Sequence, residues 1–294
     1  MKARAYDRYP LAWLLPTLIP VLLFTLYPVA DAFYTSLHQV IVIFPAQPFI
    51  GFENYRQVLL SPDFRQTLGN TIAFAAVTAP LVILLGYGAA RLLLARFRGR
   101  ALLRAAIILP WVLPGAISAV VWMWILHPSW GILNLLLYEA GVISHYIPWL
   151  TDPKLARLSV VLAFVWTQFP FASILIMAAL SAIDATLYEA AQVDGANAWQ
   201  RFRHITFPGI RPVIAILAIY QSLVALTSYD LAYALTAGGP GTATTLLSFE
   251  VWKESFSMMN FGTGSAVGFI LVVLSLAFMI AIIRALPAAI SSRG

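Results

Sequence analysis

Six long stretches of this sequence contain no Asp, Glu, Lys or Arg, and this pattern restricts the chain to a membrane environment. Each stretch has at least 18 residues, and an α-helix needs roughly 20 apolar residues to cross a hydrocarbon core ~30 Å thick. Only helices and closed barrels satisfy their backbone hydrogen bonds in lipid, and continuous apolarity without alternation favours helices. We therefore predict six transmembrane helices, in Leu11–Ala30, Thr71–Ala90, Ala105–Leu126, Leu158–Ile183, Pro212–Tyr229 and Ser255–Ile283.

Three other apolar runs resemble spans, and one additional span would invert the topology of everything after it. Ala32–Phe52 contains two prolines and a glycine, and Leu231–Phe249 contains Gly-Gly-Pro-Gly. A lipid-exposed helix tolerates such turn-formers poorly. Gly131–Tyr138 is too short to span and is followed by Glu139. We place all three runs outside the membrane core, the last as a candidate interfacial helix.

The distribution of Lys and Arg predicts the orientation. If the N-terminus is cytoplasmic, 13 of the 18 basic residues lie in the predicted cytoplasmic segments and 5 in the outer loops. Cytoplasmic loops carry the excess of basic residues in membrane proteins. The bias predicts that both termini are cytoplasmic, and that the polar segment Asp184–Arg211 lies on the same side. Topology and contact with lipid headgroups account for the net charge of +6, without a nucleic-acid partner.

Several kinds of chemistry need residues that the chain lacks. None of the three lysines follows a glycine, so there is no Walker A loop to hold a nucleotide. There is no cysteine, and the four histidines are scattered, so a metal centre is not expected. The apolar stretches carry no acid–base pair that would mark a proton relay. We expect no enzyme activity and no cofactor bound by this chain, and we expect the first stretch to be retained rather than cleaved as a signal peptide.

The segment Asp184–Arg211 begins with clear helix-boundary signals. Asp184 is a good N-cap for a helix over Ala185–Val193, which is rich in helix-forming residues. Gly195 follows where a backbone reversal with positive φ would end that helix. Glu189 offers a charge to a basic partner from a helix whose alanines allow close packing. The pattern predicts a short helix at the cytoplasmic membrane face.

A second short helix is expected directly after the first. Asn197 and Gln200 have the spacing of a capping box at its start. Pro208 is expected to end it before the fifth span. Two short helices at an angle would form a rigid protrusion.

Glu189–Pro208 resembles the EAA loop of importer permeases that work with an ATP-binding cassette. That motif reads Glu-Ala-Ala, three residues, Gly, nine residues, Ile, one residue, Leu-Pro, and the chain departs from it at Phe207, where leucine is usual. More of the chain resembles one subfamily, the maltose-type or carbohydrate-uptake class 1 permeases. These matching segments are Gly51–Tyr55, Asn70-Thr71, Gly131–Asn134, Tyr188–Gly195 and Leu235–Pro240.

The resemblance implies an all-α polytopic membrane protein of six transmembrane helices, with a cytoplasmic EAA coupling loop between helices four and five. It implies one transmembrane domain over residues 1–294, with a core permease domain at about 66–285 and the coupling loop at about 184–211. The implied partners are a second homologous permease, a dimer of ATPase subunits that holds ATP and magnesium, and an extracytoplasmic solute-binding protein. The implied location is the inner membrane of a bacterium or archaeon.

The resemblance also implies which residues couple this chain to its ATPase and what it carries. Glu189 would contact a basic residue of the ATPase, and Gly195 would supply the turn. Class 1 relatives carry mono- and oligosaccharides and glycerol phosphates, so a sugar or related polyol is expected, and the sequence leaves the choice among them open. The implied coupling residues are Glu189, Ala190, Ala191, Asp194, Gly195, Ile205 and Pro208.

Polar side chains in or beside the apolar stretches are candidates for the solute path, because polar groups at membrane depth are costly unless they face protein or water. They are Gln168, Gln221, Ser222, Tyr229 and Asp230. Sugar hydroxyls need amide or carboxylate partners, and Trp166, Phe169 and Tyr220 are available to stack on apolar sugar faces. Interhelical hydrogen bonding explains each polar residue equally well, and Asp230 fits a solvated loop. Trp111 is assigned to the interfacial belt or the bundle core.

Two other functions compete with an ATP-driven importer. A secondary carrier driven by an ion gradient needs an intramembrane acid or an ion cage, and the apolar stretches offer neither convincingly. A membrane-embedded enzyme needs a nucleophile–base pair or a metal constellation, which the sequence does not suggest. Both are therefore less well supported than the importer.

Overall fold

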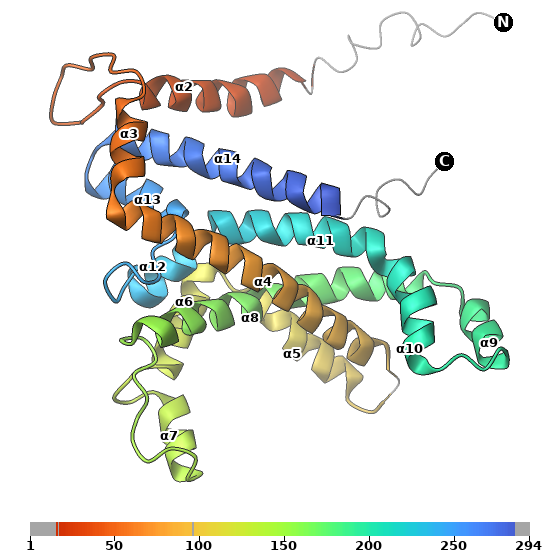
Figure 1. Cartoon of the computed structure of the whole chain (residues 1–294). Coiled ribbons are helices and arrows are strands. Elements are labelled where there is room, and N and C mark those ends of the chain that lie inside the picture. Colours follow the sequence, from red (N-terminus) through yellow and green to blue (C-terminus); the bar gives the residue numbers. More distant parts are fainter. Residues whose placement is uncertain (1–15, 17, 96, 286–294) are drawn as a thin grey trace, which may run out of the picture. The chain divides into compact units, whose positions relative to one another are not determined.

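The computed structural model describes residues 16, 18–95 and 97–285, and this part of the chain is α-helical without a β-strand (Figure 1). It contains five helices that are long and apolar enough to cross a membrane, or six if one bent pair is counted as a span. The prediction of an all-α polytopic membrane protein is confirmed. The contacts divide the chain into two compact units. One holds the described residues up to Ser61 together with Val251–Ile270, and the other holds Pro62–Glu250 and the described residues from Leu271 onward.

The first unit begins with a membrane-spanning helix over Leu18–Ser36. This helix contains the π-helical turn η2 (Leu22–Leu26) and continues as α2 (Tyr27–Ser36). It overlaps the predicted stretch Leu11–Ala30, of which positions 11–15 and 17 lie outside the described residues. The helix also extends a few residues into the run that was predicted to be a loop.

A buried asparagine fixes the remainder of that loop. Asn54 lies in the first turn of α3 (Glu53–Leu60), and its Nδ2 donates to the carbonyl oxygens of Ser36 at 2.8 Å and His38 at 2.9 Å. The unit is completed by η4 (Lys253–Ser257) and the first part of α14 (Phe261–Ala285). The turn-rich residues between α2 and α3 therefore form a pinned loop and not a span, as predicted.

Three long helices form the core of the second unit: α4 (Pro62–Leu94), α8 (Pro153–Ser181) and α11 (Phe207–Thr227). Small residues let them approach closely, because a Cβ atom at Gly86 would lie only 2.8 Å from the Cβ of Ala172. Small residues at contacts between helices are the usual solution in membranes, where the hydrophobic effect does not drive helix association. The predicted second, fourth and fifth spans correspond to these three helices.

The third predicted span, Ala105–Leu126, needs correction because it is not one continuous helix. It is divided into α5 (Arg100–Val112) and α6 (Gly115–Ile125), which meet at a bend of 107°. Leu113 has an extended backbone, with φ −76° and ψ 133°, because the ring of Pro114 disfavours the helical region for the residue before it. Apolarity alone could not reveal this break.

The remaining elements of the second unit are short. α7 (Ile132–Glu139) is the short helix predicted beyond the third span. α12 (Asp230–Thr236) and α13 (Leu247–Trp252) are separated by the glycine-rich turn, so Leu231–Phe249 is not a span. The sixth predicted stretch corresponds to α14, whose α-helix begins only at Phe261.

Candidate functional site

The polar segment after α8 forms a short helix, α9 (Ala185–Val193), with a defined cap at each end. At its start, a carboxylate oxygen of Asp184 accepts a hydrogen bond from the backbone N–H of Thr186 at 2.9 Å. This backbone hydrogen bond, together with one from the Thr186 hydroxyl, holds the pKa of Asp184 below its ordinary value. The cap that the sequence predicted at Asp184 is confirmed.

The C-terminal end of α9 is a Schellman motif built on glycine. Gly195 has φ +75°, and its N–H donates to the carbonyl of Gln192 at 3.1 Å, while Ala196 N–H donates to Ala191 at 2.8 Å. A residue with a Cβ atom rarely adopts this backbone conformation. The predicted reversal at Gly195 is confirmed.

The second short helix, α10 (Ala198–Arg201), begins with the predicted capping box. The Asn197 side chain accepts from Gln200 N–H at 2.9 Å, and the Gln200 side chain accepts from Asn197 N–H at 2.7 Å. The prediction that Pro208 ends this helix is wrong. α10 continues through the π-helical turn η3 (Phe202–Thr206) into α11, and the whole of Ala198–Thr227 forms one span.

The π turn explains how the helix passes the proline. Proline lacks an N–H and is tolerated in the first turn of a helix, where that donor is not needed. η3 changes the hydrogen-bond register immediately before Pro208, which places the proline in the first turn of α11. The helix therefore enters the membrane without a break.

α9 and α10 lie together beyond the ends of α8 and α11, as Figure 1 shows. The hydroxyls of Tyr188 on α9 and Thr206 on η3 are 2.9 Å apart, and this hydrogen bond joins α9 to the start of the fifth span. We call residues 184–208 the coupling segment. Its two helices are fixed both to each other and to a membrane helix.

Most predicted coupling residues face solvent in this chain. Ala191 and Ile205 are half-buried, whereas the exposed ones are Glu189, Ala190, Asp194, Gly195 and Pro208. Three large apolar residues that the sequence reasoning did not select are also exposed: Leu187 at 52%, Val193 at 89% and Trp199 at 65%. The sequence could have identified them, because large apolar residues are unexpected in a segment that is predicted to lie outside the membrane. Exposed apolar side chains beside an acidic residue are typical of a protein-docking surface.

The predicted solute-path residues do not form one cluster. Gln221 is completely buried in α11, and within the described part of the chain neither its amide nitrogen nor its oxygen has a hydrogen-bond partner. Among the described residues, the interhelical hydrogen bond considered for Gln221 is not present. Ser222 is buried and lines an apolar pocket, and Gln168 is half-buried on α8.

Asp230 occupies a position at the break of the third span. It is the first residue of α12, and its carboxylate lies against Gly115, the first residue of α6, so that a Cβ atom there would collide with it. A carboxylate at a helix N-terminus is stabilised by the exposed N–H groups. Asp230 is therefore not a solvated loop residue. Tyr229, just before it, is more than one third exposed.

An aromatic row crosses three helices near the same break. Trp111 on α5 lies 5.4 Å from Phe171 on α8, and Phe171 lies 5.1 Å from Tyr220 on α11, between ring centroids. Trp111 and Tyr220 are each 43% exposed. Trp166 instead packs edge-on against Trp122, at 5.8 Å. The row offers flat ring surfaces of the kind on which sugars stack.

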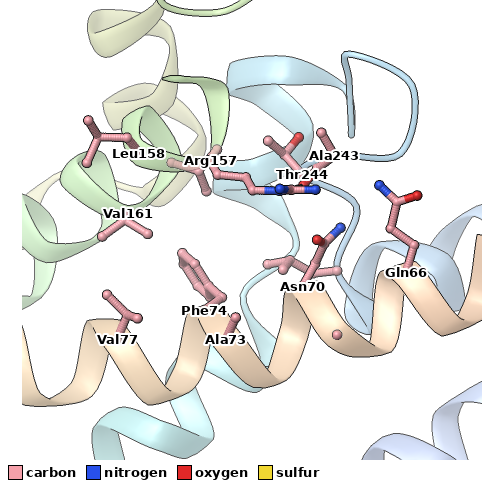
Figure 2. Close-up of a pocket in the computed structure, with 13 residues that line it drawn as sticks. Gln66, Asn70, Ala73, Phe74, Val77, Arg157, Leu158, Val161, Ala243 and Thr244 are labelled. Carbon is pink, nitrogen blue, oxygen red and sulfur yellow. The ribbon is translucent and has the colours of Figure 1, made fainter. Parts of the chain in front are cut away.

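A pocket of about 320 Å³ lies between α4, α8 and the turn after α12. Figure 2 shows its polar lining, Gln66, Asn70 and Arg157, at one end and Val77 and Val161 at the other. Arg157 Nε donates to the carbonyl of Ala243 at 2.9 Å, and Asn70 Nδ2 donates to that of Thr242 at 2.8 Å. None of the predicted path residues lines this pocket. Within the described residues, no group of three His, Asp or Glu side chains is placed to hold a metal ion.

Comparison with known proteins relates this arrangement to one family. Residues 82–291 match the family described as the binding-protein-dependent transport system inner membrane component. The chain is 38% identical, over 92% of its length and 91% of the relative's, to the trehalose/maltose transport system permease protein MalF of Thermococcus litoralis. It is 34% identical, over 90% of its length and 85% of the relative's, to the sulfoquinovosyl glycerol transport system permease protein SmoG of Agrobacterium fabrum.

A solved structure has the same fold. A chain of a bacterial ABC transporter involved in the import of the acidic polysaccharide alginate matches with a TM-score of 0.80 and 26% identity, over 98% of both chains. A second crystal structure, of an alginate transporter in complex with its pentasaccharide-bound periplasmic protein, matches with a TM-score of 0.77 and 26% identity, over 96% of both.

Proposed function

The chain belongs to the family of binding-protein-dependent transport system inner membrane components, and from this membership we propose that it forms the path for a sugar or related polyol. It is the permease subunit of an ATP-binding-cassette importer and a multi-pass inner-membrane protein, and subunits of this kind have no nucleotide-binding domain. Similar proteins are named for trehalose and maltose, for sulfoquinovosyl glycerol and for alginate. All of these solutes are rich in hydroxyl groups, which supports a carbohydrate for this chain.

The coupling segment receives the energy of ATP. Binding-protein-dependent importers work with ATPase subunits and a solute-binding protein, and here two ATPase subunits and a second homologous permease complete the assembly. Glu189 and Val193 lie one turn apart on the same face of α9, so an acidic and an apolar group meet the ATPase together. ATP-driven closure of the ATPase dimer moves this segment and turns the solute path outward.

The solute path runs beside the broken third span. Non-helical backbone at membrane depth is tolerated where protein buries it or where it lines a water-filled cavity. The break at Leu113 is followed at Gly115 by the Asp230 carboxylate, and the row from Trp111 to Tyr220 lies across the neighbouring helices. These groups supply an acceptor for hydroxyls and faces for sugar rings. Gln168 lies one helical turn from Phe171 and adds an amide to this surface.

The observation that supports the coupling role is the exposed acidic and apolar surface of α9. The helix is fixed at its start by the Asp184 cap and at its end by the Schellman motif at Gly195. The test uses the assembled importer in vesicles, with its ATPase, its second permease and its loaded solute-binding protein. Glu189→Arg is expected to lower ATP-driven uptake at least about tenfold, because a like charge opposite a basic group costs several kcal/mol. Gly195→Pro should do the same, since proline cannot adopt the positive φ of this position.

Glu139→Arg is the matched control, because Glu139 is exposed at the end of α7 and carries the same charge change away from the coupling segment. Its uptake is expected to equal that of the unaltered chain. All three variants are first checked for assembly with the ATPase. Normal uptake by assembled Glu189→Arg and Gly195→Pro would contradict the coupling role. Solute movement by this chain alone under an ion gradient would favour a secondary carrier.

A further inference from the structure

Two pockets of different character share a wall in the second unit. A polar pocket of about 440 Å³ lies beneath the coupling segment and is lined by Arg91 of α4 and Arg201 of α10. An apolar pocket of about 610 Å³ lies between α4, α11 and the second half of α14. Phe202 lines both pockets. The two spaces are therefore neighbours and differ mainly in charge.

The lining residues show that the pockets follow one groove. On α4 they recur every three or four residues, so they lie on a single face: Ala76, Pro80, Ile83, Tyr87, Arg91 and Leu94. The facing wall runs along η3 and α11 through residues three to five positions apart: Phe202, Phe207, Ile210, Ile214 and Ala218. From Ala76 to Tyr87 the apolar part measures ~17 Å along the helix axis. That is close to half of a ~30 Å hydrocarbon core, which is the depth of one lipid leaflet.

Tyr87 marks the change from apolar to polar lining. Its hydroxyl accepts a hydrogen bond from Arg91 Nη1 at 3.1 Å, and the Arg91 guanidinium carbon is 5.9 Å from the centre of its ring. The same ring packs edge-on against Phe202, with centroids 5.7 Å apart. One helical turn therefore separates a hydrocarbon-lined groove from a cationic pocket.

Within the described residues, no carboxylate balances the positive charge of the polar pocket. Neither Arg91 nor Arg201 forms an ion pair with a carboxylate of the described residues, and the other lining residues of this pocket are neutral. Guanidinium groups bind phosphate through paired, charge-assisted hydrogen bonds. A molecule that fits both pockets must be anionic at one end and apolar along the rest of its length.

We propose that this groove binds an anionic phospholipid, with its phosphate between Arg91 and Arg201 and an acyl chain along α4 and α11. The bilayer itself supplies such molecules at the depth of the groove. This site is separate from solute import, and its assignment to the cytoplasmic leaflet rests on the topology proposed for the coupling segment. Tyr188 and Gln192 of α9 also line the polar pocket, so the bound headgroup would contact the coupling helix.

The experiment counts phospholipids that the assembled importer retains, by native mass spectrometry, after exchange into phosphatidylcholine with or without phosphatidylglycerol. The unaltered chain is expected to retain phosphatidylglycerol in preference to phosphatidylcholine. The double variant Arg91→Gln/Arg201→Gln should lose this retention by about tenfold or more, because hydrogen bonds to a charged group are removed. Ala76→Phe, which fills the exposed apolar groove and changes no charge, should also lower it.

Arg98→Gln is the matched control, because Arg98 is exposed in the loop between α4 and α5 and does not line either pocket. Full retention by this variant, and partial retention by Arg91→Lys/Arg201→Lys, would support a defined site. Equal retention by the double Gln variant and the control would overturn the proposal.

Binding of inorganic phosphate in lipid-free detergent with the same arginine dependence would identify a soluble anion instead. Crosslinking of an Ala76→Cys variant to the second permease would show that protein, and not lipid, covers the groove. Counting bound lipids does not require a working transport cycle. The experiment can therefore disprove the lipid site without disproving the import function, and the uptake experiment can do the reverse.

Discussion

At the scale of single residues, the contact between Gly115 and Asp230 joins two features that the sequence places far apart. The carboxylate lies against the first residue of α6, where a side chain would collide with it. Glycine leaves room for this close approach, and any side chain here would make the end of the Asp230 side chain move, although the φ of Gly115 is not in the left-handed region. The pair therefore holds α12 against the break in the third span.

Gly115→Ala is expected to destabilise the protein by ~1–3 kcal/mol, the usual cost of overpacking a close contact. Adding Asp230→Ala should recover part of that loss, because the second change removes the colliding carboxylate. The measurement is the thermal stability of the detergent-purified assembly for both single variants and the double variant. Strictly additive losses would mean that the two residues do not interact in this way.

The sequence could nominate Asp230 but could not assign its environment. A carboxylate just after an apolar stretch fits a loop, a solute path or a helix terminus, and the choice depends on the bend at Leu113. Gln221 was nominated in the same way, and its complete burial depends on how α11 packs among the other helices. A polar residue at membrane depth is predicted to have a structural or functional role, because burying it in lipid is costly. Which of these roles it has is determined by its tertiary contacts.

At the scale of elements, the coupling segment was the most predictable part of the chain. Its boundaries depend on local chemistry: a carboxylate cap at Asp184, a glycine at Gly195, and the Asn197–Gln200 capping box. The break between α5 and α6 and the π turn before Pro208 were not predicted. Both are changes of backbone register within apolar sequence, where proline permits several outcomes and packing selects one.

The Asp184 cap predicts how the stability of α9 depends on pH. Its pKa is lowered in the folded chain by hydrogen bonds from Thr186, so its contribution is complete above the unfolded pKa and is lost as pH falls through the folded pKa. Hydrogen exchange of the α9 amides, corrected for intrinsic rates, should show protection declining in that acidic range. Asp184→Asn, which caps without a charge, should lack this decline. An identical decline in both proteins would assign the effect to another group.

At the scale of the whole molecule, the distribution of basic residues predicts which surfaces face the cytoplasm. The chain has no cysteine, so single cysteines report location without background labelling. Val193→Cys on α9 and Val142→Cys beyond α7 are suitable because these side chains are 89% and 68% exposed. A membrane-impermeant maleimide should label Val142→Cys in right-side-out vesicles and Val193→Cys only in inside-out vesicles. The opposite pattern would mean that the topology, and the coupling role with it, is inverted.

That the chain has five or six spans was predictable at this scale, because length and apolarity determine their number. The groove proposed to bind lipid was not, since its two walls come from α4 and from η3–α11, more than a hundred residues apart along the chain. The lining sides of these two walls come to face each other only when the helices pack together. Pattern reasoning within one segment cannot detect a surface shared by two.

The unbroken helix from α10 through η3 to α11 has a mechanical consequence. Its 30 residues follow a helical path ~45 Å long, with Trp199 near one end and the approach to Asp230 at the other. A displacement of α10 is carried to α11 through a continuous helix that can bend at the π turn η3 and at Pro212. Movement of α10 is therefore expected to reach the far end of α11 as a change of angle at these points.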